Sequence, residues 1–148
     1  MNILADTCFW ISLCDSSEND HIEVQAMVEK IFADKCHRIL VPYPVLYETL
    51  CSEMVKRRDR VLFLTKYFDD VVKVPDAEYV NEAYKIVKQQ ADLCKGTASM
   101  TDISIMLMAK DIKNNVKGIL TRNGRDFSEF CRNLRIPMIE NMAILEAV

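Results

Sequence analysis

The opening stretch Met1–Cys14 reads MNILADTCFWISLC, and it decides the fold class. Ile3–Ala5 is a short apolar run of the kind found in buried strands, and it ends at Asp6 and Thr7. Both residue types favour the cap position of a helix. The apolar segment Cys8–Cys14 that follows is suited to a short buried helix. The opening therefore predicts a strand that passes directly into a helix, with an acid at the junction.

The same alternation continues through the rest of the chain. We expect further strands at Arg38–Val41, Val71–Val74, Gly118–Thr121 and Ile136–Ile139, and helices at His21–Lys35, Pro44–Val55, Asp59–Phe68, Asp76–Leu93, Thr101–Ile112 and, as a helical turn, Asp126–Cys131. Strands that alternate with helices predict an α/β fold. We expect a three-layer sandwich, in which a largely parallel central sheet of four or five strands is flanked by helices. Such sheets bind ligands outside the carboxyl ends of their strands.

Composition fits one globular domain, and we expect a single domain over residues 1–148. Half of the residues are hydrophobic and 28% are charged, while 3 Gly and 4 Pro leave little room for long linkers. The N-terminus has no basic leader, and no apolar run approaches the roughly 18 residues of a membrane helix. We therefore expect a cytoplasmic protein that makes no contact with the membrane.

The net charge of −3 counts against nucleic-acid binding. Positive charge is nevertheless concentrated in the run Lys56–Arg60 and at Arg122, Arg125, Arg132 and Arg135. A nuclease whose site is a cluster of carboxylates also carries negative charge by design. For any single basic residue, a solvated surface position is the commoner case.

The 6 cysteines form no CxxC pair and no Cys/His zinc spacing. Most of them fall in apolar segments, where a free Cys behaves as a small hydrophobe. We interpret them as reduced structural residues, and we expect no zinc site.

Four acids deserve inspection because of where the predicted elements place them. Asp6 follows the first strand, Asp102 opens the most apolar helix, and Asp126 follows the fourth strand together with Asn123. Glu48 lies inside a helix. Taken singly, each acid is adequately explained as a helix cap or a solvated residue.

Two of these acids resist that simple explanation. Glu48 lies in the otherwise apolar run Pro44–Leu50, and Asp102 leads the helix with the most apolar residues. Acids in such segments need a partner, and neither segment offers an obvious Lys or Arg. Two carboxylates about 4 Å apart repel by roughly 4 kcal/mol at an effective dielectric near 20. Several carboxylates can therefore converge only if a cation joins them.

Oxygen ligands without nitrogen or sulfur favour Mg²⁺ or Mn²⁺ over zinc. An ion held in this way keeps bound waters and binds phosphate oxygens. It also activates an attacking water and stabilises charge on a phosphate. The acids thus indicate hydrolysis of phosphodiester bonds.

The sequence resembles a known family, the PIN domains. The segments that carry the resemblance are Ile3–Thr7, Glu48 after a Val-Pro strand end, Thr101–Ile105 and Ile119–Phe127. They look like the four acidic blocks of that family, in order and at suitable spacing, and the resemblance covers nearly the whole chain. The branch that looks closest is that of the VapC-type toxins of toxin–antitoxin pairs.

The resemblance implies a PIN fold and a Mg²⁺- or Mn²⁺-dependent endoribonuclease. Asp6, Glu48 and Asp102 match the three best-defined metal ligands of the family. The fourth ligand stays open between Asp126, which we favour, and Asn123 as a polar helper. Two further residues match hydroxyl positions near the metal, namely Thr7 and Thr121.

The resemblance also implies partners: an RNA substrate, a second copy of the chain in a homodimer, and an antitoxin protein whose tail enters the acidic site. We expect selectivity for RNA to depend on basic residues, namely Arg57, Arg58, Arg122 and Arg125. The sequence leaves open which RNA is cut, whether DNA is also a substrate, and whether a cognate antitoxin exists.

Two other functions compete with the nuclease. The first is a PIN-like module with little or no catalytic activity that binds RNA or protein, which the net charge of −3 favours slightly. The second is a signalling domain in which Asp6 accepts a phosphoryl group. That second function needs a Lys at a later strand end, where this chain has Thr121 and Arg122.

Overall fold

A five-stranded sheet forms the centre of the protein. The computed structural model describes residues 1–52, 56–94 and 98–148. In sequence order the strands are β1 (Asn2–Ala5), β2 (Arg38–Pro42), β3 (Val72–Val74), β4 (Val116–Leu120) and β5 (Met138–Ile139). Their order across the sheet is β3-β2-β1-β4-β5, and every neighbouring pair is parallel. The predicted α/β architecture is confirmed.

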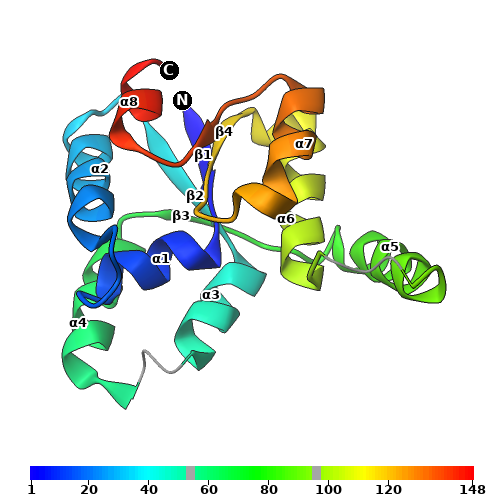
Figure 1. Cartoon of the computed structure of the whole chain (residues 1–148), viewed down its shortest axis with the longest axis horizontal. Helices are drawn as coiled ribbons and strands as arrows, with labels where there is room; N and C mark the ends of the chain where they lie inside the picture. The colour runs from blue at the N-terminus through cyan, green and yellow to red at the C-terminus, as the bar shows by residue number, and fades with distance from the viewer. Residues whose placement is uncertain (53–55, 95–97) are drawn as a thin grey trace.

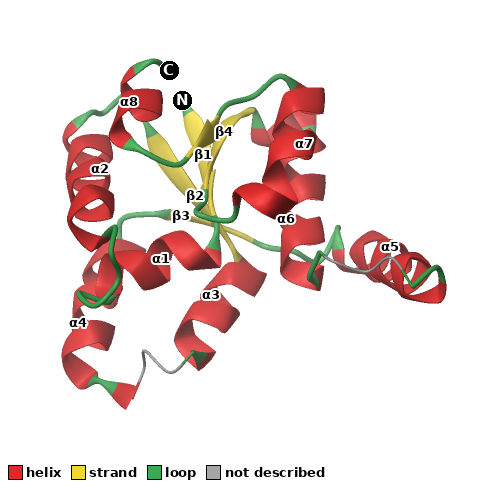
Figure 2. Cartoon of the chain, viewed as in Figure 1, coloured by secondary structure: helices red, strands yellow, loops and turns green. Residues whose placement is uncertain are grey.

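The described ranges contain eight α-helices: α1 (Thr7–Cys14), α2 (His21–Ala33), α3 (Tyr43–Cys51), α4 (Arg58–Phe68), α5 (Val80–Asp92), α6 (Met100–Lys110), α7 (Gly124–Leu134) and α8 (Met142–Glu146). A short 3-10 helix, η2 (Ile112–Asn114), precedes β4. Figures 1 and 2 show α1, α2 and α4 on one side of the sheet and α6 and α7 on the other. Helix α5 projects from the body and packs against α6.

The apolar strands explain why the centre of the sheet is buried. Ile3, Leu4 and Ala5 of β1 are fully buried, as are Ile119 and Leu120 of the adjacent strand β4. A strand covered by helices on both faces loses nearly all solvent contact, which favours continuous apolar runs over alternating ones. At the edge of the sheet, Val72 of β3 is exposed.

The strand order creates a switch point between β1 and β4. From β1 the chain moves outward through β2 and β3, and it then returns to the other side of β1 as β4 and β5. Helices therefore diverge from this point to opposite faces, and the carboxyl ends of β1 and β4 border the crevice where open α/β sheets bind ligands. The residues at these two ends are Asp6 and Thr121.

Several element boundaries differ from the prediction. Helix α5 begins at Val80 because Asp76–Tyr79 forms a turn, in which the Asp76 carbonyl accepts from the amides of Tyr79 and Val80 at 2.8 and 3.0 Å. Helix α7 extends over Gly124–Leu134 and is more than the expected turn. Helix α8 was not predicted, and the end of the helix expected over Pro44–Val55 lies outside the described residues.

The structure also bears on the cysteines and on membrane crossing. Cys14 and Cys131 are buried and Cys8 is half-buried, but Cys36, Cys51 and Cys94 are exposed, so the expectation that most cysteines lie in apolar surroundings is wrong for half of them.

In the part of the chain that the structure describes, no helix has the length and apolar character needed to cross a bilayer.

Candidate active site

Asp6 lies at the switch point as the N-cap of α1, and it is 4% exposed. Its carboxylate accepts hydrogen bonds from three neutral donors. The Thr7 amide donates to Oδ1 at 2.6 Å, while the Cys8 thiol and the Thr121 hydroxyl each donate to Oδ2 at 2.9 Å. The capping role foreseen as an alternative is therefore real, and it fixes the carboxylate at the carboxyl end of β1.

Asp102 is a second buried acid, 8% exposed in the first turn of α6. It forms a capping box with Ser99, because the Ser99 amide donates to Asp102 Oδ2 at 2.7 Å and the Ser99 hydroxyl accepts from the Asp102 amide at 3.0 Å. Within the described chain Oδ1 of Asp102 has no hydrogen-bond donor. This oxygen is left available for another ligand.

Glu48 of α3 links these two acids through hydroxyl groups. Thr7 Oγ1 donates to Glu48 Oε2 at 2.7 Å, and Thr101 Oγ1 donates to Oε1 at 2.5 Å. Thr7 directly follows Asp6, and Thr101 directly precedes Asp102. Glu48 is exposed, contrary to the expectation drawn from its apolar segment, although both of its carboxylate oxygens accept from threonine hydroxyls. The structure thus brings together three of the predicted acids from α3 and from the N-termini of α1 and α6.

The pKa of Asp6 depends on burial, on its hydrogen bonds and on the charge of Asp102. Burial raises the pKa of Asp6 above its usual 3.8, hydrogen bonds from Cys8, Thr121 and the Thr7 amide lower it, and the charge of Asp102 raises it further. Burial and the charge of Asp6 raise the pKa of Cys8 to about 12, so this residue remains a thiol donor. A cation between Asp6 and Asp102 would relieve the repulsion that acts on Asp6.

Helix N-termini surround the acids. Helices α1, α3 and α7 start directly after β1, β2 and β4, and α6 starts with the capping box that contains Asp102. In Figure 1, α1 and α3 begin next to each other beyond the ends of β1 and β2. Helix N-termini carry partial positive charge and free amides, which favour carboxylates and phosphates. The edge therefore suits an anionic phosphodiester once a cation balances the acids.

Asn123 and Asp126 form a separate pair at the start of α7. Asn123 Nδ2 donates to Asp126 Oδ2 at 2.7 Å, and Arg125 Nε donates to Asp126 Oδ1 at 3.1 Å. The hydrogen bonds from Arg125 and Asn123 lower the pKa of Asp126. The backbone amide of Asn123 donates to Thr121 Oγ1 at 2.9 Å. This hydrogen bond connects the pair to the hydroxyl that donates to Asp6.

The expected RNA-contacting arginines lie in different settings. Arg125 is exposed beside Asp126. Arg57 forms an ion pair with Asp59, and it lies with Arg58 at the start of α4, which Figure 1 places far from the strand ends. The guanidinium of Arg122 contacts other residues of the protein.

Two residues of the site were missed in the sequence, Cys8 and Thr101. Both are adjacent or nearly adjacent to a predicted acid, and each donates a hydrogen bond to a carboxylate. A rule that inspects the neighbours of each candidate acid for hydroxyl and thiol donors would have found them. Cys8 was set aside because it was counted as a hydrophobe.

The donor set can be tested against the expected ion. In the described ranges, no group of three or more His, Cys, Asp and Glu side chains is arranged to hold a metal. The chemistry of the donors nevertheless fits Mg²⁺ or Mn²⁺, because they are carboxylate oxygens, and within the described chain one of them, Asp102 Oδ1, has no hydrogen-bond donor. Asp6, Asp102 and Glu48 are the residues that would hold the ion.

Comparison with known proteins places the fold. No protein-family model matches the sequence, and no curated protein matches it. Among solved structures, VapC20 of Mycobacterium tuberculosis, a sarcin–ricin loop cleaving toxin, superposes with a TM-score of 0.64 at 18% identity, over 86% of this chain and 94% of that one. A chain of VapBC2 from Rickettsia felis, bound to a DNA fragment from its promoter, gives 0.58 at 12% identity, over 87% and 92%.

These similarities define the fold class. The parallel sheet flanked by helices is the PIN-like fold of the VapC structures, as the sequence blocks predicted. The structures that resemble the chain include VapC toxin structures. This agrees with the branch of the PIN family that the sequence resembles.

Proposed function

We propose that this protein is a Mg²⁺- or Mn²⁺-dependent endoribonuclease and the toxin of a toxin–antitoxin pair. The observation that carries the proposal is the buried pair Asp6 and Asp102. The charge of Asp102 acts on Asp6, and within the described chain Asp6 receives hydrogen bonds from neutral groups alone. Each acid also caps a helix, but a cap needs no second carboxylate near it, whereas a divalent cation is bound by carboxylates that converge.

Each residue of the site has a distinct task in the proposed reaction. Asp6 and Asp102 bind the ion, and Glu48, oriented by Thr7 and Thr101, completes the ligands on the α3 side. When bound, the ion activates a water and neutralises charge on the scissile phosphate. Asp126 is proposed as the fourth acid, with Asn123 holding its carboxylate. Thr121 fixes the orientation of Asp6.

The similar structures support a ribonuclease with a protein partner. VapC20 is a toxin that cleaves the sarcin–ricin loop, and VapBC2 is bound to promoter DNA. By extension we propose that this chain cuts a structured RNA and binds an antitoxin. Arg125 is the basic residue that we favour as an RNA contact, because its side chain is exposed beside Asp126. We also propose a homodimer, which the exposed Tyr84 of α5 and Leu93 at the C-terminal cap of α5 would favour.

The test is cleavage of total cellular RNA by the purified protein with EDTA, Mg²⁺ or Mn²⁺. We expect discrete fragments that need metal and that vanish with Asp6→Asn. Asn is as good an N-cap as Asp, so the variant keeps the start of α1 while it loses a metal ligand. Growth arrest on expression, relieved by a small protein encoded nearby, would distinguish a toxin from another nuclease. Folded wild type that cuts no RNA in any metal would contradict the proposal.

Two observations favour a second function, a module that binds RNA or protein without cutting. No ready-made group of metal ligands exists among the described residues, and the net charge is −3. This function predicts that metal leaves the melting temperature unchanged. If millimolar Mn²⁺ raises the melting temperature of wild type but not of Asp6→Asn, the binding-only function is excluded.

A further inference from the structure

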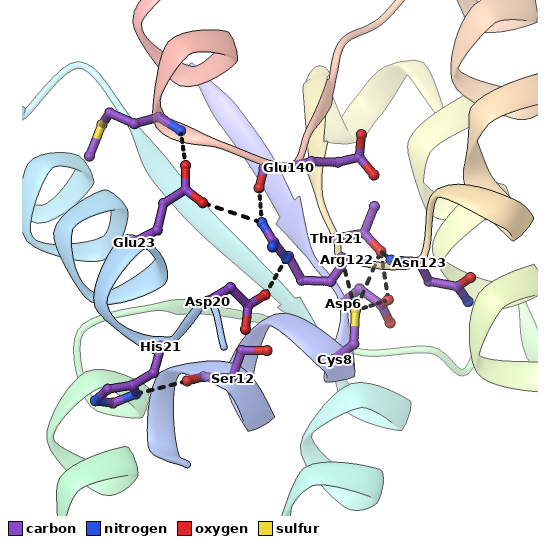
Figure 3. Close-up of polar contacts among 11 residues, drawn as sticks. Asp6, Cys8, Ser12, Asp20, His21, Glu23, Thr121, Arg122, Asn123 and Glu140 are labelled. Carbon is purple, nitrogen blue, oxygen red and sulfur yellow. Dashed lines mark hydrogen bonds and ion pairs between the residues drawn. The ribbon is translucent and has the colours of Figure 1, made fainter. Parts of the chain in front are cut away.

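Arg122 connects the acidic site to two distant elements. It directly follows Thr121, and its guanidinium forms an ion pair with Asp20, which precedes α2, and lies 3.7 Å from Oε2 of Glu23. It also donates a hydrogen bond to the carbonyl of Glu140, between β5 and α8. Figure 3 shows the side chain reaching from the end of β4 to these acceptors and away from Asp6. The guanidinium is therefore engaged by the protein itself.

The same segment contacts Asp6 directly through Thr121 and indirectly through Cys8. The Arg122 amide donates to Cys8 Sγ at 3.1 Å, and the Thr121 hydroxyl donates to Asp6 Oδ2 at 2.9 Å. The Cys8 thiol donates to the same carboxylate oxygen at 2.9 Å. Both hydrogen bonds to Oδ2 thus depend on where residues 121 and 122 lie. Any movement of this segment would move the donors that orient Asp6.

The far end of the connection is itself fixed. His21, next to Asp20, has Nδ1 2.9 Å from the carbonyl of Ser12 on α1 (Figure 3). Glu23 also accepts from the Met142 amide at 3.2 Å, which ties α2 to the start of α8. Arg122 is therefore bound to an anchored part of the molecule, and its contacts restrict the position of the segment between β4 and α7.

We propose that Arg122 is a positioning residue, which holds Thr121 and Cys8 against Asp6 so that the carboxylate is oriented for metal. This inference rests on the proposed function, since it concerns the same site. It replaces our expectation that Arg122 contacts RNA. A turn of the guanidinium toward RNA would leave Asp20, whose side chain is 15% exposed, without its counter-charge. Groups that orient metal ligands without touching the metal commonly affect metal affinity strongly.

The chain offers a matched control in Arg60. Its guanidinium binds Asp15 through Nη1 and Nη2 at 2.7 and 2.6 Å, at the other end of the connection between α1 and α2. Arg60 and Asp15 have side chains that are 17% and 20% exposed, similar to those of Arg122 and Asp20 at 30% and 15%. Within the described chain, no hydrogen bond or ion pair of Arg60 reaches residues 121–123. Loss of Arg60 thus removes a comparable ion pair without disturbing the donors to Asp6.

The experiment compares wild type with Arg122→Gln, Arg122→Lys, Asp20→Asn and Arg60→Gln. Isothermal titration with Mn²⁺ measures metal affinity in the absence of RNA, and cleavage kinetics separate kcat from KM. We expect Arg122→Gln to weaken Mn²⁺ binding by about 10- to 100-fold and to lower kcat, with KM for RNA unchanged. Arg122→Lys should recover part of the loss, and Asp20→Asn should weaken binding in the same direction. Arg60→Gln should lower the melting temperature and leave Mn²⁺ affinity unaltered.

Two results would overturn the inference while the proposed function stands. A raised KM with unchanged Mn²⁺ affinity in Arg122→Gln would make Arg122 an RNA contact. Equal losses of Mn²⁺ affinity in Arg122→Gln and Arg60→Gln would mean that Arg122 forms only an ordinary stabilising ion pair. A wild type that binds no Mn²⁺ would instead overturn the proposed function and the inference together. Should Arg122→Gln fail to fold, Asp20→Asn decides the question, because Asn remains a good residue at the start of α2.

Discussion

At the scale of single residues, Asp6 combines two tasks that are usually considered as alternatives. It caps α1 through Oδ1, and its other oxygen accepts from Cys8 and Thr121. The same is true of Asp102, which belongs to a capping box and still has Oδ1 free of donors within the described chain. A structural explanation of an acid therefore does not exclude a functional one. The cap fixes the backbone, and the carboxylate stays available for an ion.

Thr121 provides the first prediction at this scale. It is fully buried, and its hydroxyl donates to Asp6 and accepts from the Asn123 amide. Thr121→Val keeps the shape but leaves both partners unsatisfied, so we expect unfolding free energy in urea to fall by about 1–3 kcal/mol. Thr121→Ser retains the hydroxyl and should recover most of this loss. Equal stability of the Val and Ser variants would argue against the hydrogen bonds as the cause.

At the scale of elements, the connection between α1 and α2 is held at both ends by an arginine. Arg60 binds Asp15 at its start, and Arg122 binds Asp20 at its end. The connection lies between the first helix of the site and the anchored N-terminus of α2. Both ion pairs join segments that are far apart in the sequence, so neither was visible as a pattern.

Asp15 gives this connection a dependence on pH. Hydrogen bonds from the Ser17 hydroxyl and amide, together with the Arg60 guanidinium, lower the pKa of Asp15 from 3.8 to about 2. A lowered carboxyl pKa adds stability above the ordinary value, and that stability disappears as pH falls through the folded value. We expect wild type to be more stable than Asp15→Asn at neutral pH, and the difference to vanish as pH falls from 3.8 toward 2. Urea denaturation along a pH series measures it, and a constant difference would contradict the assignment.

Helix α4 depends on a few apolar side chains. Leu64 is fully buried between α4 and the core, whereas Leu62 on the same helix is 63% exposed. Leu64→Ala should cost about 2–5 kcal/mol of unfolding free energy because it leaves a cavity. Leu62→Ala should stay within about 0.5 kcal/mol, as a surface substitution. Thermal or chemical denaturation of the two variants tests this, and similar losses would mean that α4 does not pack as described.

The sequence predicts elements better than their ends, and the reasons are local. The strand of Ile3–Ala5 is continuous and apolar, so it could be recognised directly. Helix α7 was underestimated because Gly124 and polar residues obscure its start, and α8 is only 5 residues long. Asp6 could be predicted because it directly follows a strand, and Glu48 and Asp102 because they are acids in apolar segments. The contacts of the Arg122 guanidinium were not predicted, because its partners come from other elements.

At the scale of the whole molecule, the strand order β3-β2-β1-β4-β5 gathers the site. It places the ends of β1 and β4 side by side, and the helices that follow them diverge to opposite faces. Helices α3 and α6 contact each other, so Glu48 and Asp102 approach the same edge. Acids separated by 42 and 54 residues in the chain, Asp6 to Glu48 and Glu48 to Asp102, therefore meet through topology. No single segment contains the site.

The most direct test of this arrangement is a crystal structure of the protein grown with MnCl₂, with anomalous scattering measured to locate manganese. We expect a manganese ion that is bound by Asp6 and Asp102, and that Glu48 binds directly or through a water molecule. This ion should be absent from crystals of Asp6→Asn grown in the same way. Manganese bound elsewhere, or none at this edge in wild-type crystals at millimolar concentration, would contradict the claim that these acids form a metal centre.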